Sequence, residues 1–180
     1  MTIDISQTAI VLIDVQGNLA QAMHDKDTLF KNLEVLMKAA TLLDIPVIWM
    51  EQVPHALGPT VPEVAAQLYG NTPIAKTSFS CYQNADFRAA LEAANRETLI
   101  LTGIETHICV YQSAVDLITR GYAVQVAMDA VSSRIPENKA LGLARIRQAG
   151  ACITGTEMLL FELLKDATHP QFKQIVSLIK

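Results

Sequence analysis

The sequence lacks the features that several protein classes need. It has only three cysteines, Cys81, Cys109 and Cys152, and their spacing shows no pairs. A disulfide framework needs paired cysteines, so this pattern indicates reduced thiols in a cytoplasmic protein. The net charge is −4 and lysine and arginine form no cluster, which argues against nucleic acid as a partner.

Long apolar runs and phosphate-binding motifs are also missing. The apolar run at residues 9–13 is far too short to span a bilayer, and no charged segment followed by an apolar one indicates a signal peptide. Neither G-x-G-x-x-G nor G-x-x-x-x-G-K-[ST] occurs in the chain. We therefore expect no membrane partner and no cofactor.

The chain does contain the material for a compact core. Apolar residues make up 51% and charged residues 18% of the 180 residues, a composition that excludes a disordered chain. This length is ordinary for one domain, so we expect a single domain over residues 1–180.

Strand and helix patterns alternate from one end of the chain to the other. Short β-favouring runs predict strands at residues 8–15, 46–50, 73–76, 98–101, 122–128 and 151–154. Apolar residues at spacings of three and four, together with caps, predict helices near 29–43, after Asn84, from about 107, at 136–149, at 158–164 and after His169. Residues 154–157 fit a capping box in front of the helix at 158–164. The alternation predicts a doubly wound α/β fold with a mostly parallel sheet, whose ligands bind beyond the carboxyl ends of the strands.

Residues 97–120 carry the first candidate functional residue. A strand ends at Gly103, Thr106 is an N-cap candidate, and Cys109 falls in the first turn of the helix that follows. A helix N-terminus lowers the pKa of a thiol and offers backbone N–H groups to an oxyanion. The alternative is a small apolar cysteine that packs under the helix.

Two more residues have the right chemistry to join Cys109. Asp14 closes the first strand, where it could take the thiol proton and pass it to a leaving group. Lys76, among small and apolar residues, would keep the carboxylate and the thiolate charged. The alternatives are that Asp14 is a turn residue and Lys76 a solvated lysine. Both alternatives stay open, because a sequence does not show which residues lie close together.

The chain contains the three segments IVLIDVQ, KTSFS and LTGIETHICVYQSA. In their order and separations they resemble the isochorismatase-like cysteine hydrolase family. The resemblance runs from Thr8 to about Leu164. It implies a catalytic triad of Asp14, Lys76 and Cys109. It also implies a Rossmann-like, three-layer sandwich with a six-stranded parallel sheet, and a cis peptide at Ile104–Glu105 that aims the N–H groups of Glu105 and Cys109 at the substrate oxygen.

The resemblance implies a cofactor-independent hydrolase that forms a thioester with a small amide-like substrate, an amidase for C–N bonds other than peptide bonds. Two alternatives stay open: an isochorismate-type vinyl-ether hydrolase, and a catalytically silent binding protein of the same fold. A thiol redox protein is weakened because no second cysteine lies near Cys109. We expect a homo-oligomer, a dimer or larger, with contacts from residues 106–111 and 158–164.

The segment after the second strand sets the expectations for metals and for the pocket. Nicotinamide-hydrolysing members of the family carry Asp-x-His and a further His there, whereas this chain reads WMEQVPHALG with His55 alone, so we expect no metal site. The segment resembles a branch whose members mostly lack an assigned substrate. Candidate pocket residues are Gln16, Glu51, Gln52, Phe79 and His107. Glu51 and Gln52 are equally loop residues in this interpretation, and Phe79 is equally a core aromatic.

Three remaining residues receive supporting roles. His107 is a poor base for Cys109, since side chains two apart on a helix diverge, and we expect it to contact substrate or a neighbouring subunit. Asp129 is expected to end a strand and to form structural hydrogen bonds, as the resemblance implies. Cys81 and Cys152 are expected to be packing residues.

Overall fold

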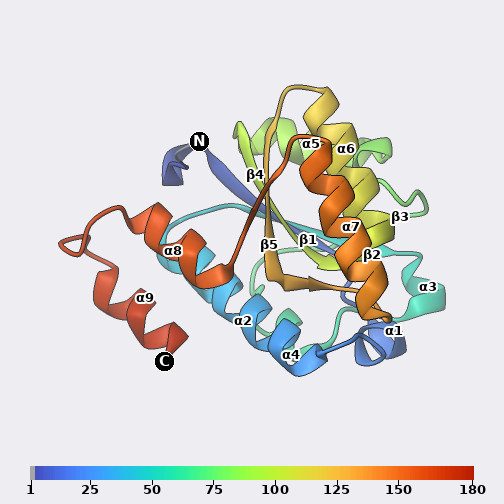
Figure 1. Ribbon diagram of the computed structural model, residues 1–180, viewed down its shortest axis with the longest axis horizontal. Coiled ribbons are helices and arrows are strands. Elements are labelled where there is room, and N and C mark those ends of the chain that lie inside the picture. The colour runs from blue at the N-terminus through green and yellow to red at the C-terminus, as the bar shows by residue number, and fades with distance from the viewer. Residues whose placement is uncertain (1–2) are drawn as a thin grey trace.

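The structure, a computed structural model, describes residues 3–180, and within these residues six strands form one parallel sheet (Figure 1). The order across the sheet is β3-β2-β1-β4-β5-β6. The strands are β1 (Thr8–Ile13), β2 (Val47–Gln52), β3 (Ile74–Lys76), β4 (Thr98–Ile104), β5 (Ala123–Ser132) and β6 (Cys152–Thr154).

The two central strands, β1 and β4, are buried along their whole lengths because helices cover both faces of the sheet. They pair in register from Thr8↔Thr98 to Ile13↔Gly103. The chain first builds outward from β1 to β3 and then outward from β4 to β6, so the direction of winding reverses between β1 and β4. Such a switch point opens a crevice at the carboxyl ends of the two strands.

Helices form a layer on each face of the sheet. The helical segments are η1 (Ile5–Gln7), α1 (Gly17–Gln21), α2 (Lys26–Leu42), α3 (Pro54–Leu57), α4 (Pro62–Ala65), η2 (Cys81–Gln83), α5 (Ala85–Ala94), η3 (Thr106–Val110), α6 (Tyr111–Thr119), α7 (Pro136–Gln148), α8 (Thr156–Leu164) and α9 (Phe172–Ile179). The core of one face takes residues from α2, α4, α8 and α9, and that of the other from α5, α6 and α7 (Figure 1). No helix among the described residues has the length and apolarity to cross a membrane. The predicted three-layer, six-stranded α/β fold is confirmed.

Local sequence signals account for much of this arrangement. In α2, Leu29, Leu33, Leu36 and Ala40 recur at spacings of three and four, and all four are buried against the sheet. Asn84 caps α5 as predicted, because its side chain accepts a hydrogen bond from the backbone N–H of Phe87 at 2.9 Å.

Two predictions near the end of the sheet are wrong. Asp129 lies inside β5, which continues to Ser132, rather than at the end of a strand. The capping box expected at residues 154–157 does not form, because α8 has Gly155 at its N-cap with no side-chain hydrogen bond. Asp129 supplies the cap instead: its carboxylate accepts hydrogen bonds from the N–H and the hydroxyl of Thr156 at 2.9 and 2.8 Å. A tertiary contact thus replaces the local one, and Asp129 forms the structural hydrogen bonds expected of it.

The two cysteines that were expected to pack differ from each other. Cys81 is fully buried, in agreement with the prediction. Cys152 is exposed, so its predicted packing role is wrong. It lies on β6, one of the two edge strands of the sheet.

Candidate active site

The carboxyl ends of β1 and β3 bring a buried ion pair together. Asp14 directly follows β1 with a φ of 55°, and Lys76 is the last residue of β3. Lys76 Nζ lies 2.6 Å from Asp14 Oδ2, and the side chains are 0% and 2% exposed, respectively. The alternative of a solvated Lys76 is therefore wrong. The ammonium also donates to Gln52 Oε1 at 2.5 Å and to the carbonyl of Ser78 at 3.2 Å.

Gln16 and Gln52 form a frame behind this pair. The Gln52 side chain accepts from Lys76 and donates to the carbonyl of Thr77 at 2.8 Å. Gln16 Oε1 accepts from the backbone N–H of Gln52 at 2.6 Å, while Gln16 Nε2 donates to the carbonyls of Gln52 and Gly58. Gln16 is 0% exposed with both ends of its amide bound to backbone, so it is a structural tie rather than a pocket surface.

Glu51 has a similar structural task. It lies inside β2, not in a loop, and it is buried. Its Oε1 accepts from the N–H and the hydroxyl of Thr60 at 2.7 and 2.8 Å, which holds the segment between α3 and α4 against the strand. The side chain of Gln52, in contrast, reaches the ion pair directly and remains at the site.

The turn after β4 carries Cys109. Gly103 has a φ of 104°, and a Cβ there would lie 2.0 Å from the carbonyl oxygen of Ile13, so only glycine lets β4 approach β1 this closely. The peptide bond Ile104–Glu105 is cis. The chain then forms η3, a π-helical turn, and Thr106 is buried there without a hydrogen-bond partner for its hydroxyl. The predicted N-cap role of Thr106 is therefore wrong, because the wide turn moves the start of α6 to Tyr111.

The electrostatics of the Cys109 thiol differ from expectation. Burial raises its pKa well above the ordinary value, and the neighbouring negative charge of Asp14 raises it further. Cys109 is only 7% exposed, and these two effects outweigh the opposing charge of Lys76, so the direction is opposite to the one that a helix N-terminus would give. Both effects favour the neutral thiol over the thiolate.

Asp14 is arranged to receive the thiol proton. Burial raises the pKa of its carboxyl group, while the charge of Lys76 and a hydrogen bond with Cys109 both oppose that rise. Its Oδ2 is bound to Lys76, whereas its Oδ1 is buried and has no hydrogen-bond partner among the described residues. The Cys109 side chain lies beside this carboxyl group. The three side chains thus form a chain of contacts in the order Lys76, Asp14, Cys109.

The remaining candidates lie around this group. Phe79 is 54% exposed, so the core alternative is wrong for it, and its carbonyl oxygen lies 3.4 Å from Lys76 Nζ. His107 Nδ1 lies 3.0 Å from the hydroxyl of Ser133, not on the thiol. His55 is exposed, and no group of three or more potential metal ligands occurs in residues 3–180.

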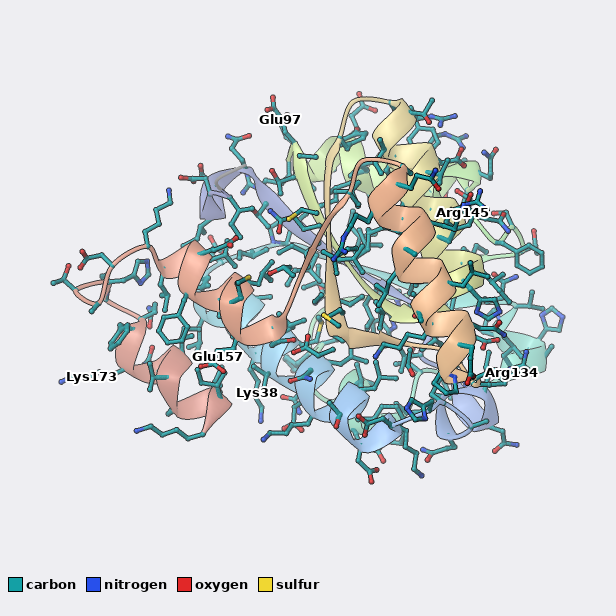
Figure 2. The ribbon with its side chains drawn as sticks, in the orientation of Figure 1. Lys38, Glu97, Arg134, Arg145, Glu157 and Lys173 are labelled. Atoms are coloured by element: carbon teal, nitrogen blue, oxygen red, sulfur yellow. The ribbon has the colours of Figure 1, made fainter. Side chains whose placement is uncertain are left out.

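Sequence reasoning missed the partners of the Glu105 side chain. Its carboxylate accepts from the backbone N–H of Arg134 at 3.0 Å and from Arg134 Nε at 3.1 Å. Figure 2 shows Arg134 at the end of α7 opposite to Arg145, far from Glu97 and the amino ends of the strands. No spacing rule connects residues 29 positions apart, so only the fold could have revealed this contact.

Comparison with known proteins identifies the family. The model of the Isochorismatase domain family matches residues 8–158. The chain belongs to this family. Among isochorismatase relatives, the mouse isochorismatase domain-containing protein 2A is 44% identical over 149 residues, which cover 81% of this chain and 69% of that protein. The human isochorismatase domain-containing protein 2 is 43% identical over the same shares.

Solved structures extend the comparison within this isochorismatase fold. A Caenorhabditis elegans protein described as MAR1 ribonuclease has a TM-score of 0.93 and 36% identity, covering 99% of this chain and 92% of its own. YcaC from Escherichia coli, an octameric hydrolase of unknown specificity, has a TM-score of 0.89 and 26% identity, covering 98% and 95%. YcaC from Pseudomonas aeruginosa, with hexane-2,5-diol and covalent acrylamide, has a TM-score of 0.92 and 25% identity, covering 98% and 91%.

Proposed function

We propose that this protein is a cysteine hydrolase of small amides in which Cys109, Asp14 and Lys76 form the catalytic triad. The observation that carries the proposal is the buried contact chain. Lys76 holds one oxygen of Asp14 at 2.6 Å, the other oxygen is buried without a hydrogen-bond partner among the described residues, and the Cys109 side chain lies beside the same carboxyl group. A buried carboxylate with one free oxygen beside a thiol can take the thiol proton.

The first step forms a thioester. Cys109 Sγ attacks the amide carbonyl carbon while its proton passes to Asp14 Oδ1, and the carbonyl π electrons move to the oxygen. The backbone N–H groups of Glu105 and Cys109 are the proposed donors to that oxyanion. Neither N–H donates any of the loop or side-chain hydrogen bonds in residues 3–180, which supports this role. The C–N bond then breaks as Asp14 returns the proton to the leaving amine.

The second step releases the acid. Asp14, again ionised, takes a proton from water as the water attacks the thioester carbon, and the proton then returns to the Cys109 sulfur. Lys76 keeps its proton throughout and holds Asp14 in place. Because burial and Asp14 raise the pKa of the Cys109 thiol, we expect the proton transfer to accompany the attack rather than to precede it.

A panel of small neutral amides tests the proposal. Wild-type protein should release amine, and intact-mass measurement during turnover should show the acyl group on Cys109. Asp14→Asn and Cys109→Ala should release none. An RNA oligonucleotide belongs in the panel because the C. elegans relative is described as a ribonuclease. Amine release that survives Cys109→Ala would overturn the proposed mechanism.

A vinyl-ether hydrolase is the second candidate, and the raised pKa of Asp14 is the observation that favours it. Vinyl-ether cleavage requires a general acid, and a buried carboxyl group that protonates readily can serve as one. In that case Cys109→Ala should retain most of the activity on an isochorismate-type substrate, whereas Asp14→Asn should lose it.

We also propose a homo-oligomer. The E. coli relative is described as octameric. Five of the seven exposed large apolar side chains in the described part of the chain lie between residues 128 and 161: Met128, Ile135, Leu141, Met158 and Phe161. Light scattering at micromolar concentration should give a mass of at least two chains, and a monomer would contradict this proposal.

A further inference from the structure

The segment at the end of β5 holds the turn that carries Cys109. We call residues 132–134 the clamp segment. Its last residue, Arg134, donates two hydrogen bonds to the Glu105 carboxylate, one from the backbone and one from Nε. The Glu105 side chain is 5% exposed although that of Arg134 is 57% exposed. A buried carboxylate is therefore tied to a residue whose guanidinium remains accessible to solvent.

The clamp segment is itself fixed on its other side. The carbonyl oxygen of Ser133 accepts from the backbone N–H of His24 at 3.0 Å, and the hydroxyl of Ser132 donates to the carbonyl of His24 at 2.6 Å. Both serines are buried. The clamp segment thus connects the loop between α1 and α2 to the turn after β4, and it has little freedom to follow a displaced Glu105.

Two further contacts hold the same turn. Ser133 Oγ lies 3.0 Å from Nδ1 of His107. Gly142 of α7 packs directly on the backbone, since a Cβ there would lie 2.8 Å from the nitrogen and 2.9 Å from the Cα of His107. The turn is therefore held through the side chains of Glu105 and His107 and through close backbone contact.

We propose that the Glu105 side chain, held by Arg134, is a positioning group for the oxyanion donors. This inference rests on the proposed function, in which the N–H of Glu105 is one of those donors. A carboxylate bound at both oxygens fixes the Cα of its residue, and with it the direction of the adjoining amide. The carbonyl oxygen of Glu105 also accepts from the N–H groups of Ile108 and Val110 at 3.0 and 3.3 Å, so the same residue anchors the turn around Cys109.

Two thiol reagents separate oxyanion stabilisation from simple access to the thiol. When acrylamide reacts, sulfur bonds to the terminal alkene carbon, the π electrons move toward the carbonyl oxygen, and the thiol proton ends on the α-carbon. The carbonyl oxygen gains negative charge in this reaction. When iodoacetamide reacts, sulfur displaces iodide and the thiol proton is lost to Asp14 and solvent, without charge on that oxygen. The ratio of the acrylamide rate to the iodoacetamide rate at Cys109 therefore measures how strongly the backbone donors stabilise this negative charge.

The experiment measures both rates by peptide mass mapping, with the exposed thiol of Cys152 as an internal reference. In wild type the acrylamide-to-iodoacetamide ratio should be higher at Cys109 than at Cys152. Glu105→Gln should lower the ratio at Cys109 by about tenfold, a part of the effect of losing one oxyanion donor. The ratio at Cys152 should not change.

Arg134→Gln is a second variant that keeps the backbone donor and removes Nε, and it should lower the ratio less than Glu105→Gln does. Arg147→Gln is the matched control, because Arg147 is an exposed arginine of α7. It should leave the ratio at the wild-type value. With an amide substrate, Glu105→Gln should reduce kcat by a similar factor with KM within about twofold.

The outcomes distinguish this inference from the proposed function. If the wild-type ratio at Cys109 is no higher than at Cys152, no oxyanion donors act at Cys109. The proposed mechanism would then fail together with the inference. A high wild-type ratio that both Glu105→Gln and Arg134→Gln retain would overturn the inference alone. If Glu105→Gln does not fold, the acrylamide-to-iodoacetamide ratio at Cys109 is compared between Arg134→Gln and Arg147→Gln. Equal ratios in these two variants would overturn the inference.

Discussion

Two buried carboxylates at the same edge of the sheet differ in how their oxygens are used. Asp14 gives one oxygen to a fully buried lysine, while its other oxygen has no hydrogen-bond partner among the described residues and the Cys109 side chain lies beside the carboxyl group. Glu105 gives both oxygens to Arg134, whose side chain is 57% exposed. A carboxylate with a spare oxygen beside a thiol can exchange a proton, whereas one with both oxygens occupied can only hold its surroundings in place.

The comparison also separates stability from reactivity. A buried ion pair is expensive to desolvate, and it is retained where its charge has a use. The Lys76 side chain is 0% exposed and its ammonium group lies on Asp14. Glu105 and Arg134 instead connect the ends of β4 and β5, which is a structural purpose in itself.

The largest expected effect comes from removing the proton acceptor or the nucleophile. Asp14→Asn and Cys109→Ala should each reduce amide hydrolysis by on the order of a thousandfold or more. Cys109→Ala removes little volume, so its melting temperature should remain close to that of wild type. Amine release and thermal melting are the measurements. If Glu105→Gln is as damaging as Asp14→Asn, the two carboxylates do not have separate tasks.

Lys76→Met should have the next largest effect, about a hundredfold on turnover. The change keeps the length of the side chain and removes the charge that opposes the raised pKa of Asp14. Losing a nearby cation favours the neutral carboxyl group, so the pKa of Asp14 rises further. Because the mechanism needs ionised Asp14, the acidic limb of the pH–rate profile should move to higher pH.

A lysine remote from the site provides the control for that profile. Lys173 is exposed on α9, on the far side of the molecule from Arg134 (Figure 2). Lys173→Met should change turnover by less than about twofold, since exposed charges contribute little. An unchanged profile for Lys76→Met as well would remove Lys76 from the triad.

A smaller loss should follow from Gly142→Ala, which acts on the Glu105 side of the site. The added methyl group meets backbone atoms of His107 and Thr106 at 2.8 to 2.9 Å, so α7 or the turn must shift. We expect about 1–3 kcal/mol lower stability and a drop of about tenfold in kcat. Ala144→Ser, on an exposed position of the same helix, should change neither quantity. The measurements are denaturant unfolding and kcat. If Gly142→Ala changes neither the stability nor kcat, the packing argument is wrong.

Thiol labelling should modify the cysteines in a definite order. Iodoacetamide at pH 7 should modify the exposed Cys152 before Cys109, because burial and Asp14 raise the pKa of Cys109. The labelling rate of Cys109 should continue to climb as the pH rises above 8, since its thiolate fraction grows throughout that range. Faster labelling of Cys109 than of Cys152 at pH 7 would show that the thiol is activated in the free protein.

The smallest effect is expected from chelation. The segment after β2 contains His55 alone and lacks the Asp-x-His pattern, so amide hydrolysis should survive extended dialysis against a chelator. Metal analysis of the purified protein accompanies the assay. Stoichiometric zinc or iron, with activity lost on its removal, would contradict this prediction.

Much of the fold was predictable because the sheet is buried on both faces. Continuous apolar runs had to become interior strands, and the alternation with amphipathic helices left a doubly wound arrangement as the natural solution. The strand bounds moved by only a few residues, except in β5, where the ladder with β4 carries the strand past Asp129 to Ser132. The predicted helix cap was correct where the capping residue and its partner are three residues apart, as at Asn84.

The sequence by itself determined the order of the strands and longer helices, the family and the three candidate catalytic side chains, since each depends on residue type and spacing along the chain. Tertiary structure alone decided that Lys76 is buried on Asp14, that Glu105 pairs with Arg134, and that Cys152 is exposed. It also decided the sign of the pKa change at Cys109, which a helix terminus had favoured in the opposite direction. Burial and charge depend on what surrounds a group in space, and the spacing of residues along a chain does not contain that information.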